Sequence, residues 1–527
     1  MADRRQAGCE RRMFHPSPRQ SPWLLTAAIL GCALGGCVVG PKYHAPSATV
    51  APPPPAYKEA ATPNVPAPAA ATAADPTAGG LGVWTPAQPQ DAQLRGKWWE
   101  IYNDAELNAL EEQLNIDNQN IKQSFENFMA ARAMIRESRA QLFPAVGANP
   151  SYAHSHSSAN VSGGTTSSLI DLPIDVSWEP DLWGKIRNTV HLAQYSAQVS
   201  AADLENERLT EQANLAIYFF ELRGQDALQQ ILQATVAGDQ KSLELVRAQY
   251  ETGVVDKIAV VQAQNALDAA QSQATNLGLA RAQYEHAIAT LIGKPASEFS
   301  LPVKPLLATP PPIPVGLPSQ LLERRPDIAA AERSMAAANA QIGIAYAAYY
   351  PSLTLSASGA LESKLWKNLL DWPSRVWSMG PSASETIFDG GSRRATVNQY
   401  TAVYNADLAG YRQTVLTALQ QVEDALSNLR ILTQQIEQQH RAVESAQEVL
   451  TLETSRYEMG LDPYIDVVSE QNTLLAARQT LAQLEIQRMT ASVQLVEALG
   501  GGWDRAQLPT TQQLTAKPSP AGTALRQ

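Results

Sequence analysis

The sequence predicts an α+β membrane protein in which very long helices adjoin short strands of alternating polarity. Three observations support this fold class: an apolar stripe with an interval of seven residues, a gapless internal repeat, and short segments in which apolar and polar residues alternate. An interval of seven is typical of helices that supercoil left-handedly against neighbours, so the stripe predicts a helical bundle. The stripe comprises Leu408, Val415, Val422, Leu429, Ile436, Val443, Leu450 and Tyr457.

The stripe falls within one uninterrupted helical segment. No proline occurs between Pro381 and Pro463, so nothing breaks a helix that runs from about Arg394 to Gly460. At 1.5 Å per residue such a helix is roughly 100 Å long. A cytoskeletal type of coiled coil is the alternative, and it would lack the alternating strands predicted elsewhere in the chain.

The chain repeats itself with a shift of 207 residues. Residues 247–271 align with residues 454–478, and the same shift carries Pro144 onto Pro351. No gap is needed over nearly the whole length of the two halves, which are expected at residues 97–294 and 317–503. This pattern indicates an internal duplication.

The N-terminus has the features of an export signal. Five arginines precede an apolar run from Trp23 to Leu34, which is too short for a transmembrane helix and predicts a signal peptide over residues 1–36. Arg11 and Arg12 resemble the start of a twin-arginine signal, although a chance match is the favoured interpretation.

Residues 34–37, Leu-Gly-Gly-Cys, resemble a bacterial lipobox, in which the cysteine thiol receives diacylglycerol before cleavage. We therefore expect Cys37 to carry diacylglycerol and a fatty acyl chain, and Val38 after it favours sorting to the outer membrane. Cys9 and Cys32 would leave with the signal, so no disulfide is expected. Residues 37–96 are rich in proline and alanine and are expected to form a tether.

Composition and motifs exclude several functions. The formal net charge of −11 makes the chain a poor candidate for binding nucleic acid. No phosphate-loop lysine motif, His-Glu-x-x-His or Cys-x-x-Cys is present, so we expect neither an enzyme nor a cofactor. His154 and His156 share one face of a predicted strand and could bind a metal, but a solvated pair is favoured and no metal site is expected.

Beyond Pro144 and Pro351 the sequence period changes from helical to two. Apolar residues alternate with polar ones over 170–178 and 353–361, which predicts strands with one apolar face. Each half has room for two strands of roughly ten residues, a length that suits a membrane span. Pro173 weakens one of these four strands, and a soluble hairpin packed on helices is the alternative. Five tryptophans near these strands suit an interfacial girdle, namely Trp178, Trp183, Trp366, Trp372 and Trp377.

Four strands cannot close a barrel, and lipid does not tolerate open strand edges. Several chains must therefore cooperate. Three copies would supply a 12-stranded transmembrane β-barrel, with four strands per chain, and the long helices would continue the three-fold ring as a helical tube.

Returning helices are expected over about Ile258–Ile292 and Tyr464–Leu499. The turns that precede them contain Gly253 and Gly460, each suited to a left-handed helix cap. Between the halves, residues 295–316 form a proline-rich connector, and residues 504–527 are expected to be disordered.

Several short motifs are specific enough to point to a known family. They are residues 37–43, Trp98-Trp99, residues 316–328, Gly390-Gly391 and residues 457–460. Together they resemble the outer-membrane factor family of the TolC and OprM type, in its NodT-like lipoprotein branch. The resemblance covers about residues 37–503, and the run from Leu317 to Ile328 is highly specific. It implies a homotrimer with the 12-stranded barrel in the outer membrane, a periplasmic α-helical barrel of coiled-coil helices and an equatorial collar.

The resemblance also implies a function, a passive exit duct of a tripartite efflux pump. Its partners would be a periplasmic adaptor (membrane fusion) protein, an inner-membrane transporter of the RND type and outer-membrane lipid. Drugs or other small molecules would be conducted across the periplasm and outer membrane, which implies a part in multidrug resistance. A duct for type I protein secretion is the alternative, and a coiled-coil lipoprotein without a pore is a third possibility.

In the family, tyrosine and aspartate contacts and aspartate rings hold the periplasmic gate closed. Tyr457 matches the gate tyrosine and Asp466 the first ring aspartate. The second ring position falls on Ser469, and the first-half counterpart of Asp466 falls on Ala259, so Asp462 and Glu470 are expected to supply charge instead. The adaptor is expected to dock at the turns, on Gly253, Val254, Gly460 and Leu461.

Overall fold

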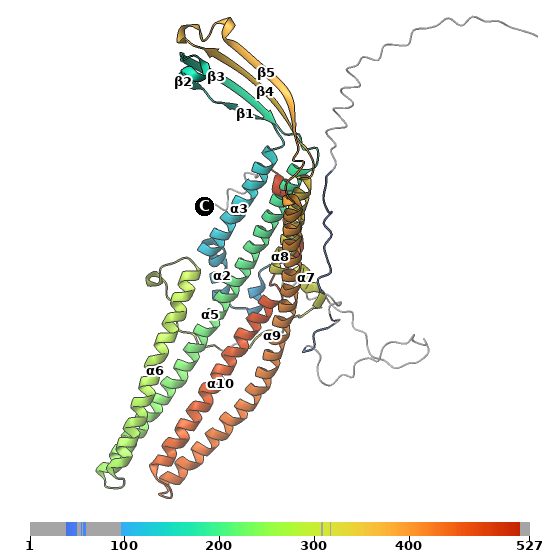
Figure 1. The fold of residues 1–527 in the computed structure, drawn as a ribbon. Helices are drawn as coiled ribbons and strands as arrows, with labels where there is room; N and C mark the ends of the chain where they lie inside the picture. Colours follow the sequence, from blue (N-terminus) through green and yellow to red (C-terminus); the bar gives the residue numbers. More distant parts are fainter. Residues whose placement is uncertain are drawn as a thin grey trace, which may run out of the picture. The chain divides into compact units, whose positions relative to one another are not determined.

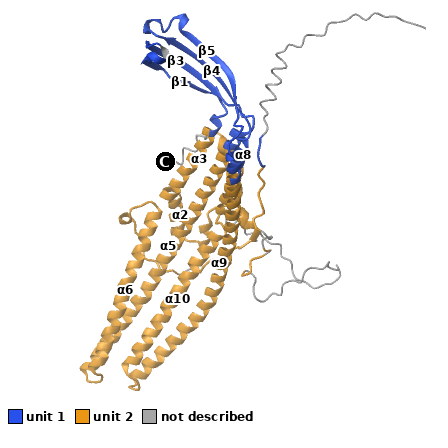
Figure 2. Ribbon diagram, viewed as in Figure 1, with its two compact units in different colours: residues 1–41, 138–190, 340–398 blue, residues 42–137, 191–339, 399–527 orange. Residues whose placement is uncertain are grey.

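The computed structural model describes residues 38–49, 54, 56–59, 96–306, 309–316 and 318–516. The predicted signal peptide and Cys37 lie outside these residues. Two compact units are present (Figure 2). Unit 1 contains residues 138–190 and 340–398 with the segment up to Pro41, and unit 2 contains the remainder.

Unit 1 is built on one antiparallel sheet with the strand order β1-β3-β4-β5, in which β2 also pairs with β3 (Figure 1). Each half of the chain therefore supplies two strand positions, as predicted, and the first of these is divided into β1 and β2. The strands are β1 (Ala145–Ala148), β2 (Ser151–His156), β3 (Thr166–Trp178), β4 (Ser352–Ser363) and β5 (Arg375–Ser384).

The division between β1 and β2 lies opposite Pro173. Ala148 pairs with Ile174 and Ser151 pairs with Asp171, so Asn149 and Pro150 leave the ladder beside a proline that has no N–H to donate. Pro173 keeps its place in β3 because Ala360 of β4 lies opposite it on the other side. The proline thus interrupts the pairing on one side of β3 rather than ending the strand.

The pairing register separates the side chains of the sheet into two faces, because directly opposite residues lie on the same side. One face is mostly apolar and the other mostly small and polar. The apolar face includes Val146, Ile170, Leu172, Ile174, Val176, Leu353, Leu355, Leu361, Trp377 and Met379. The polar face includes Ser151, Ser155, Asp171, Asp175, Ser177, Ser356, Ser358, Glu362, Ser378 and Ser382.

Two helices of 67 residues, α5 (Lys185–Glu251) and α9 (Ser392–Glu458), begin in unit 1 and continue through unit 2. Each is followed in unit 2 by a returning helix of 35 residues, α6 (Lys257–Leu291) or α10 (Tyr464–Ala498) (Figure 1). At 1.5 Å per residue α5 and α9 are about 100 Å long. The proline-free segment after Pro381 therefore forms the predicted long helix.

The helix bounds of the second half lie 207 positions after those of the first half. This holds for both ends of α5 and α9, of α6 and α10, and of α3 (Gln119–Ala140) and α8 (Pro326–Ala347). It holds also for backbone contacts. A Cβ on Gly293 would lie 2.6 Å from the carbonyl oxygen of Asp117, and one on Gly500 would meet the carbonyl oxygen of Arg324, the residue 207 after Asp117.

The largest buried cluster joins α2 (Ala105–Asp117) and the short 3-10 helix η2 (Trp98–Tyr102) to α5, α6, α9 and α10. Trp98 is fully buried, and its indole N–H donates to Gln212 at 3.1 Å. Within the described residues, no helix combines the length and apolarity needed to cross a membrane.

A buried charge network attaches the proline-rich connector to the first helix pair. Asp226 has no exposed side-chain surface, and its carboxylate accepts from Arg281 Nε at 2.7 Å and from the backbone N–H of Lys304 at 2.9 Å. Arg223 donates to Asp226 and to the carbonyl oxygen of Pro302. Arg430, which lies 207 positions after Arg223, instead forms a partly exposed ion pair with Glu59 at 2.7 Å.

The structure corrects the expected tether at one short segment. Residues 56–59 are bound to unit 2, where Tyr57 is only 2% exposed within the largest cluster. The backbone N–H groups of Lys58 and Glu59 both donate to the Glu423 carboxylate. A single aromatic residue in the proline-rich stretch therefore provides enough apolar burial to fix this segment.

The expected disorder after residue 503 is wrong for residues 504–516. Thr510 and Gln513 form a capping box that begins the short helix α11 (Thr511–Thr515). Leu514 is 4% exposed and packs with Ile135 and Ala197. A local cap and one buried leucine thus fix a segment whose composition suggested a tail.

Candidate functional site

The two turns that end the helix pairs have the same backbone geometry. Gly253 and Gly460 have φ of 75° and 74°, the left-handed conformation that favours glycine. In the second turn the N–H of Gly460 donates to the Tyr457 carbonyl at 2.9 Å, and that of Leu461 donates to the Arg456 carbonyl at 3.0 Å. This Schellman motif uses carbonyl groups that the ending helix leaves unpaired.

Tyr457 connects the two helix pairs of one chain. Its hydroxyl donates to Gln249 Oε1 of α5 at 2.5 Å, and its ring lies edge-on to Tyr464 with 5.3 Å between centroids. A tyrosine hydroxyl is protonated and can donate at neutral pH, and burial raises the pKa of Tyr457 further. No sequence pattern indicates Gln249 as its partner.

Beneath this contact, all four long helices pack in one apolar cluster. Leu243 of α5, Ala263 of α6 and Val467 of α10 are buried in it, and Leu450 of α9 packs against it. The helix ends of both pairs are therefore held together by apolar contacts as well as by the Tyr457 hydrogen bond.

Asp462 is paired within its own turn. Arg456 Nη2 donates to Asp462 Oδ1 at 3.1 Å, and Glu453 lies 3.9 Å from Arg456. The Arg456 hydrogen bond lowers the pKa of Asp462, while desolvation and the nearby Asp462 raise that of Glu453. The expected charge of Asp462 is therefore largely offset by Arg456, which no sequence pattern indicates as its partner.

Asp466 and Glu470 lie on the first two turns of α10, and the Asp466 side chain is exposed. Pro463 occupies the cap position of α10, where the first half has Asp256 as a side-chain cap. Asp466 therefore supplies the negative charge near this helix N-terminus. Ser469 is exposed and Ala259 is buried, so neither adds a carboxylate at the two departing family positions.

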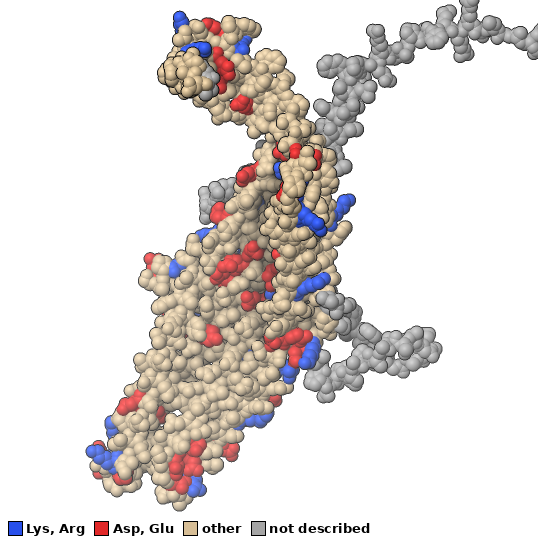
Figure 3. All heavy atoms as spheres, viewed as in Figure 1, with Lys and Arg blue, Asp and Glu red and all other residues tan. Residues whose placement is uncertain are grey.

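Both turns expose apolar side chains. Val254 is 72% exposed and Leu461 is 64% exposed, and Met459 and Ile258 are similarly open. Acidic and basic side chains flank these positions at the ends of the helix pairs (Figure 3). No atom lies within 4 Å of a Cβ built on Gly253 or Gly460, so the turns are accessible in the single chain.

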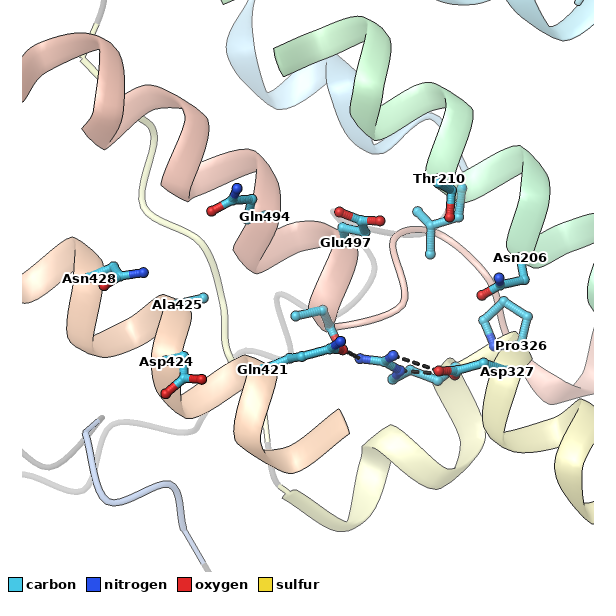
Figure 4. A pocket seen from close by; sticks show the side chains of 13 residues that line it. Asn206, Thr210, Pro326, Asp327, Gln421, Asp424, Ala425, Asn428, Gln494 and Glu497 are labelled. Carbon is cyan, nitrogen blue, oxygen red and sulfur yellow. Dashed lines mark hydrogen bonds and ion pairs between the residues drawn. The ribbon is translucent and has the colours of Figure 1, made fainter. Parts of the chain in front are cut away.

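A polar pocket of about 420 Å³ lies where α5, α8, α9 and α10 meet (Figure 4). Arg325 crosses it and donates to both oxygens of Asp327, to Gln421 at 2.7 Å and to the carbonyl oxygen of Ala498 at 3.0 Å. The family-specific Arg-Pro-Asp motif thus joins three helices, which is a structural role.

His154 and His156 do not converge on a metal site. Each imidazole Nδ1 lies within hydrogen-bond distance of a hydroxyl on β3, at 2.9 Å from Ser168 Oγ and 2.7 Å from Thr166 Oγ1 respectively. Among the described residues no group of three or more potential metal-ligating side chains is found.

The alternating sheet and the paired long helices are features of outer-membrane channels. The chain belongs to the outer membrane efflux protein family, whose pattern it matches over residues 110–294 and again over residues 317–501. It is an outer-membrane component of an efflux system, and its family consists of channels.

The chain is 30% identical to the toluene efflux pump outer membrane protein TtgF of Pseudomonas putida, over 93% of this chain and 98% of TtgF. It is 29% identical to the antibiotic efflux pump outer membrane protein ArpC of Pseudomonas putida, over 91% and 96% of the two chains. Among solved structures it resembles the outer-membrane channel OprN with a TM-score of 0.75 and 28% identity, over 89% of this chain and all of OprN.

Proposed function

We propose that three copies of this chain form the exit duct of a tripartite efflux pump. The observation that carries this proposal is the segregation of the sheet into an apolar and a polar face, together with its two open edges. In a closed barrel the apolar face would contact lipid and the polar face would line a water-filled passage. Twelve strands from three chains would leave no edge unpaired in the membrane.

The experiment for the assembly is a mass measurement. Purified protein in detergent should have a protein mass of roughly 160 kDa, three times that of the mature chain. Light scattering with correction for bound detergent measures this mass. A stable monomer would refute the shared barrel.

In the pump, the helix pairs would extend into the periplasm as an α-helical barrel, with residues near Tyr57, η2 and α11 as its equatorial collar. The gate is proposed at Tyr457 and Asp466, with Glu470 on the next turn of α10. The adaptor would dock on the exposed turns around Val254 and Leu461, because apolar side chains there have no cover in the single chain.

The anchor is proposed at Cys37. The next residues are held by unit 1, since the N–H of Val39 donates to the Trp183 carbonyl at 3.1 Å. Gly184 leaves room for Val38, whose Cα would lie 2.9 Å from any added Cβ. An acyl chain on Cys37 would therefore leave the protein close to Trp183, a residue suited to a membrane interface.

The cargo and the transporter class are proposed from the relatives. Their names record pumps for toluene and antibiotics, which favours an RND-type transporter and small-molecule cargo over type I protein secretion. Affinity purification of the tagged protein after cross-linking tests this. Recovery of an adaptor with an RND-type transporter is expected, whereas recovery of a protein-exporting ATPase would select the secretion duct.

We also propose that the two halves arose by duplication of one strand-and-helix unit. The shared offset of 207 in helix bounds and the two family matches with the same offset support this origin.

A further inference from the structure

The two edge strands of the sheet are open along their whole length in the single chain. Every residue of β1, β2 and β5 is exposed, whereas the inner strands β3 and β4 contain buried or half-buried positions. Unpaired backbone N–H and C=O groups on both edges require a partner in lipid. A second copy of this chain can supply that partner, and its register decides which residues face each other.

The internal repeat predicts this register because it extends to the sheet. The β1 and β2 segments begin and end 207 positions before the limits of β4. The pair Ser151 and Asp171 has its counterpart in the pair Ser358 and Ser378, again 207 positions later. The hairpins β2–β3 and β4–β5 therefore share one register. The β3–β4 ladder is the contact between the first and second halves of one chain, so it serves as the template for the seam, the contact between β5 of one copy and β2 of the next.

We propose that β5 of one protomer pairs with β2 of the next in the register that β3 and β4 use within a chain. The β3–β4 ladder pairs Ile170 with Ser363 and Ser177 with Ser356. The repeat equivalent of a β3 residue lies 207 positions later in β5, and that of a β4 residue lies 207 positions earlier, in or next to β2. The pair Ile170 and Ser363 thus becomes Trp377 opposite His156 of the neighbouring copy. The pair Ser177 and Ser356 becomes Ser384 opposite Asn149 of that copy. This inference rests on the proposed trimer and specifies its seam.

The side chains at this register are complementary. On the polar face, Ser378 meets Ser155 and Ser382 meets Ser151, so small residues lie opposite small residues. On the apolar face, Met379 meets His154 and Pro381 meets Tyr152, and no pair brings two like charges together. Trp377 and Met379 are each 74% exposed in the single chain, as expected for side chains that lack a neighbouring strand.

Four serines allow a matched test by disulfide trapping. Directly opposite Cβ atoms lie about 4.5–5.5 Å apart, close to disulfide reach, whereas a four-residue offset separates them by about 13 Å. Ser155→Cys with Ser378→Cys, and Ser151→Cys with Ser382→Cys, are the matched pairs. Ser155→Cys with Ser382→Cys, and Ser151→Cys with Ser378→Cys, contain the same four substitutions in mismatched combinations.

Each variant is oxidised in native outer membranes, with and without a bis-methanethiosulfonate reagent with a one-methylene spacer, and analysed on non-reducing gels. The matched pairs should give covalent dimers and trimers at least tenfold more than the mismatched pairs. Single-cysteine variants measure any background from Cys37. Ser177→Cys with Ser356→Cys is the positive control, because these residues are register partners on the same face within one chain.

The experiment distinguishes an error in the proposed register from an error in the proposed trimer. If the protein has trimeric mass and the Ser177 control closes, but the mismatched pairs cross-link as well as or better than the matched ones, the register is wrong and the trimer stands. If the mass is that of a monomer and no pair links two chains, the proposed duct fails together with its seam.

Discussion

The hydroxyl of Tyr457 donates a hydrogen bond to Gln249 Oε1 over 2.5 Å, which joins the end of α9 to the end of α5. These two residues come from different halves of the chain and from different helix pairs. Separating the pairs near their turns therefore requires breaking this bond.

Replacing Tyr457→Phe together with Asp466→Ala should raise single-channel conductance in planar bilayers without lowering trimer yield. A hydrogen bond contributes about 1 kcal/mol net, so its loss should raise the ratio of open to closed channels roughly fivefold. Tyr250→Phe is the matched control, because Tyr250 lies 207 positions before Tyr457 and is 46% exposed. Equal conductance in the double variant and the control would place the gate elsewhere.

Gly460→Val should abolish efflux while leaving outer-membrane abundance unchanged. A β-branched residue at φ 74° is strained by about 1–3 kcal/mol, and the turn would displace the exposed Leu461 from its place on the proposed docking surface. Drug susceptibility and immunoblots of membranes measure the two quantities. Gly460→Asn should retain efflux, because asparagine tolerates the left-handed conformation. Normal efflux from the valine variant would exclude this turn as a docking element.

Asp226→Ala should destabilise the protein by about 3 kcal/mol, the lower end for a broken buried ion pair, because Arg223 keeps Glu106 and Arg281 keeps Glu285 as partners. Glu59→Ala removes the half-buried partner of Arg430, the residue equivalent to Arg223, and should cost about 0–1 kcal/mol. Thermal unfolding followed by circular dichroism in detergent compares them. Equal shifts in Tm would mean that burial does not distinguish the two ion pairs.

Glu111 should make stability depend on pH. Its side chain is fully buried, and desolvation raises its pKa well above the usual value. The unfolded chain therefore releases this proton at lower pH than the folded chain, and stability falls as pH rises above about 4.3 towards the raised pKa. Glu111→Gln should match the native protein at pH 4 and exceed it in Tm at pH 8. Glu112→Gln, at an exposed neighbour, is the control, and an identical pH profile for all three proteins would contradict the assignment.

Cys37→Ser should abolish lipid labelling and delay processing of the N-terminus, while the barrel still inserts. Metabolic labelling with a fatty acid, followed by mass spectrometry of the N-terminal peptide, tests this. Mature native protein with no lipid on its first residue would disprove the anchor.

The long helices, the two turns and the strand positions could be predicted from sequence because each depends on a local pattern. Proline-free length defines α9, glycine defines the turn at Gly460, and alternation defines β4. The partners of the site residues could not be predicted in this way. Gln249 and Arg456 are ordinary helix-surface residues in the sequence, and only packing brings them to Tyr457 and Asp462. The burial of Leu514 and Tyr57 could not be predicted because one buried side chain hardly changes the composition of a polar segment.

The two copies of the repeat differ in the ion pairs by which Arg223 and Arg430 contact neighbouring extended segments. Separating Arg223 from Asp226 exposes a buried carboxylate at a cost of several kcal/mol, whereas breaking the Arg430–Glu59 ion pair costs about 1 kcal/mol or less. Residues 56–59 are therefore held mainly by the burial of Tyr57, an apolar contact that salt does not screen. Raising the ionic strength should thus weaken the Arg430 ion pair and leave this segment in place.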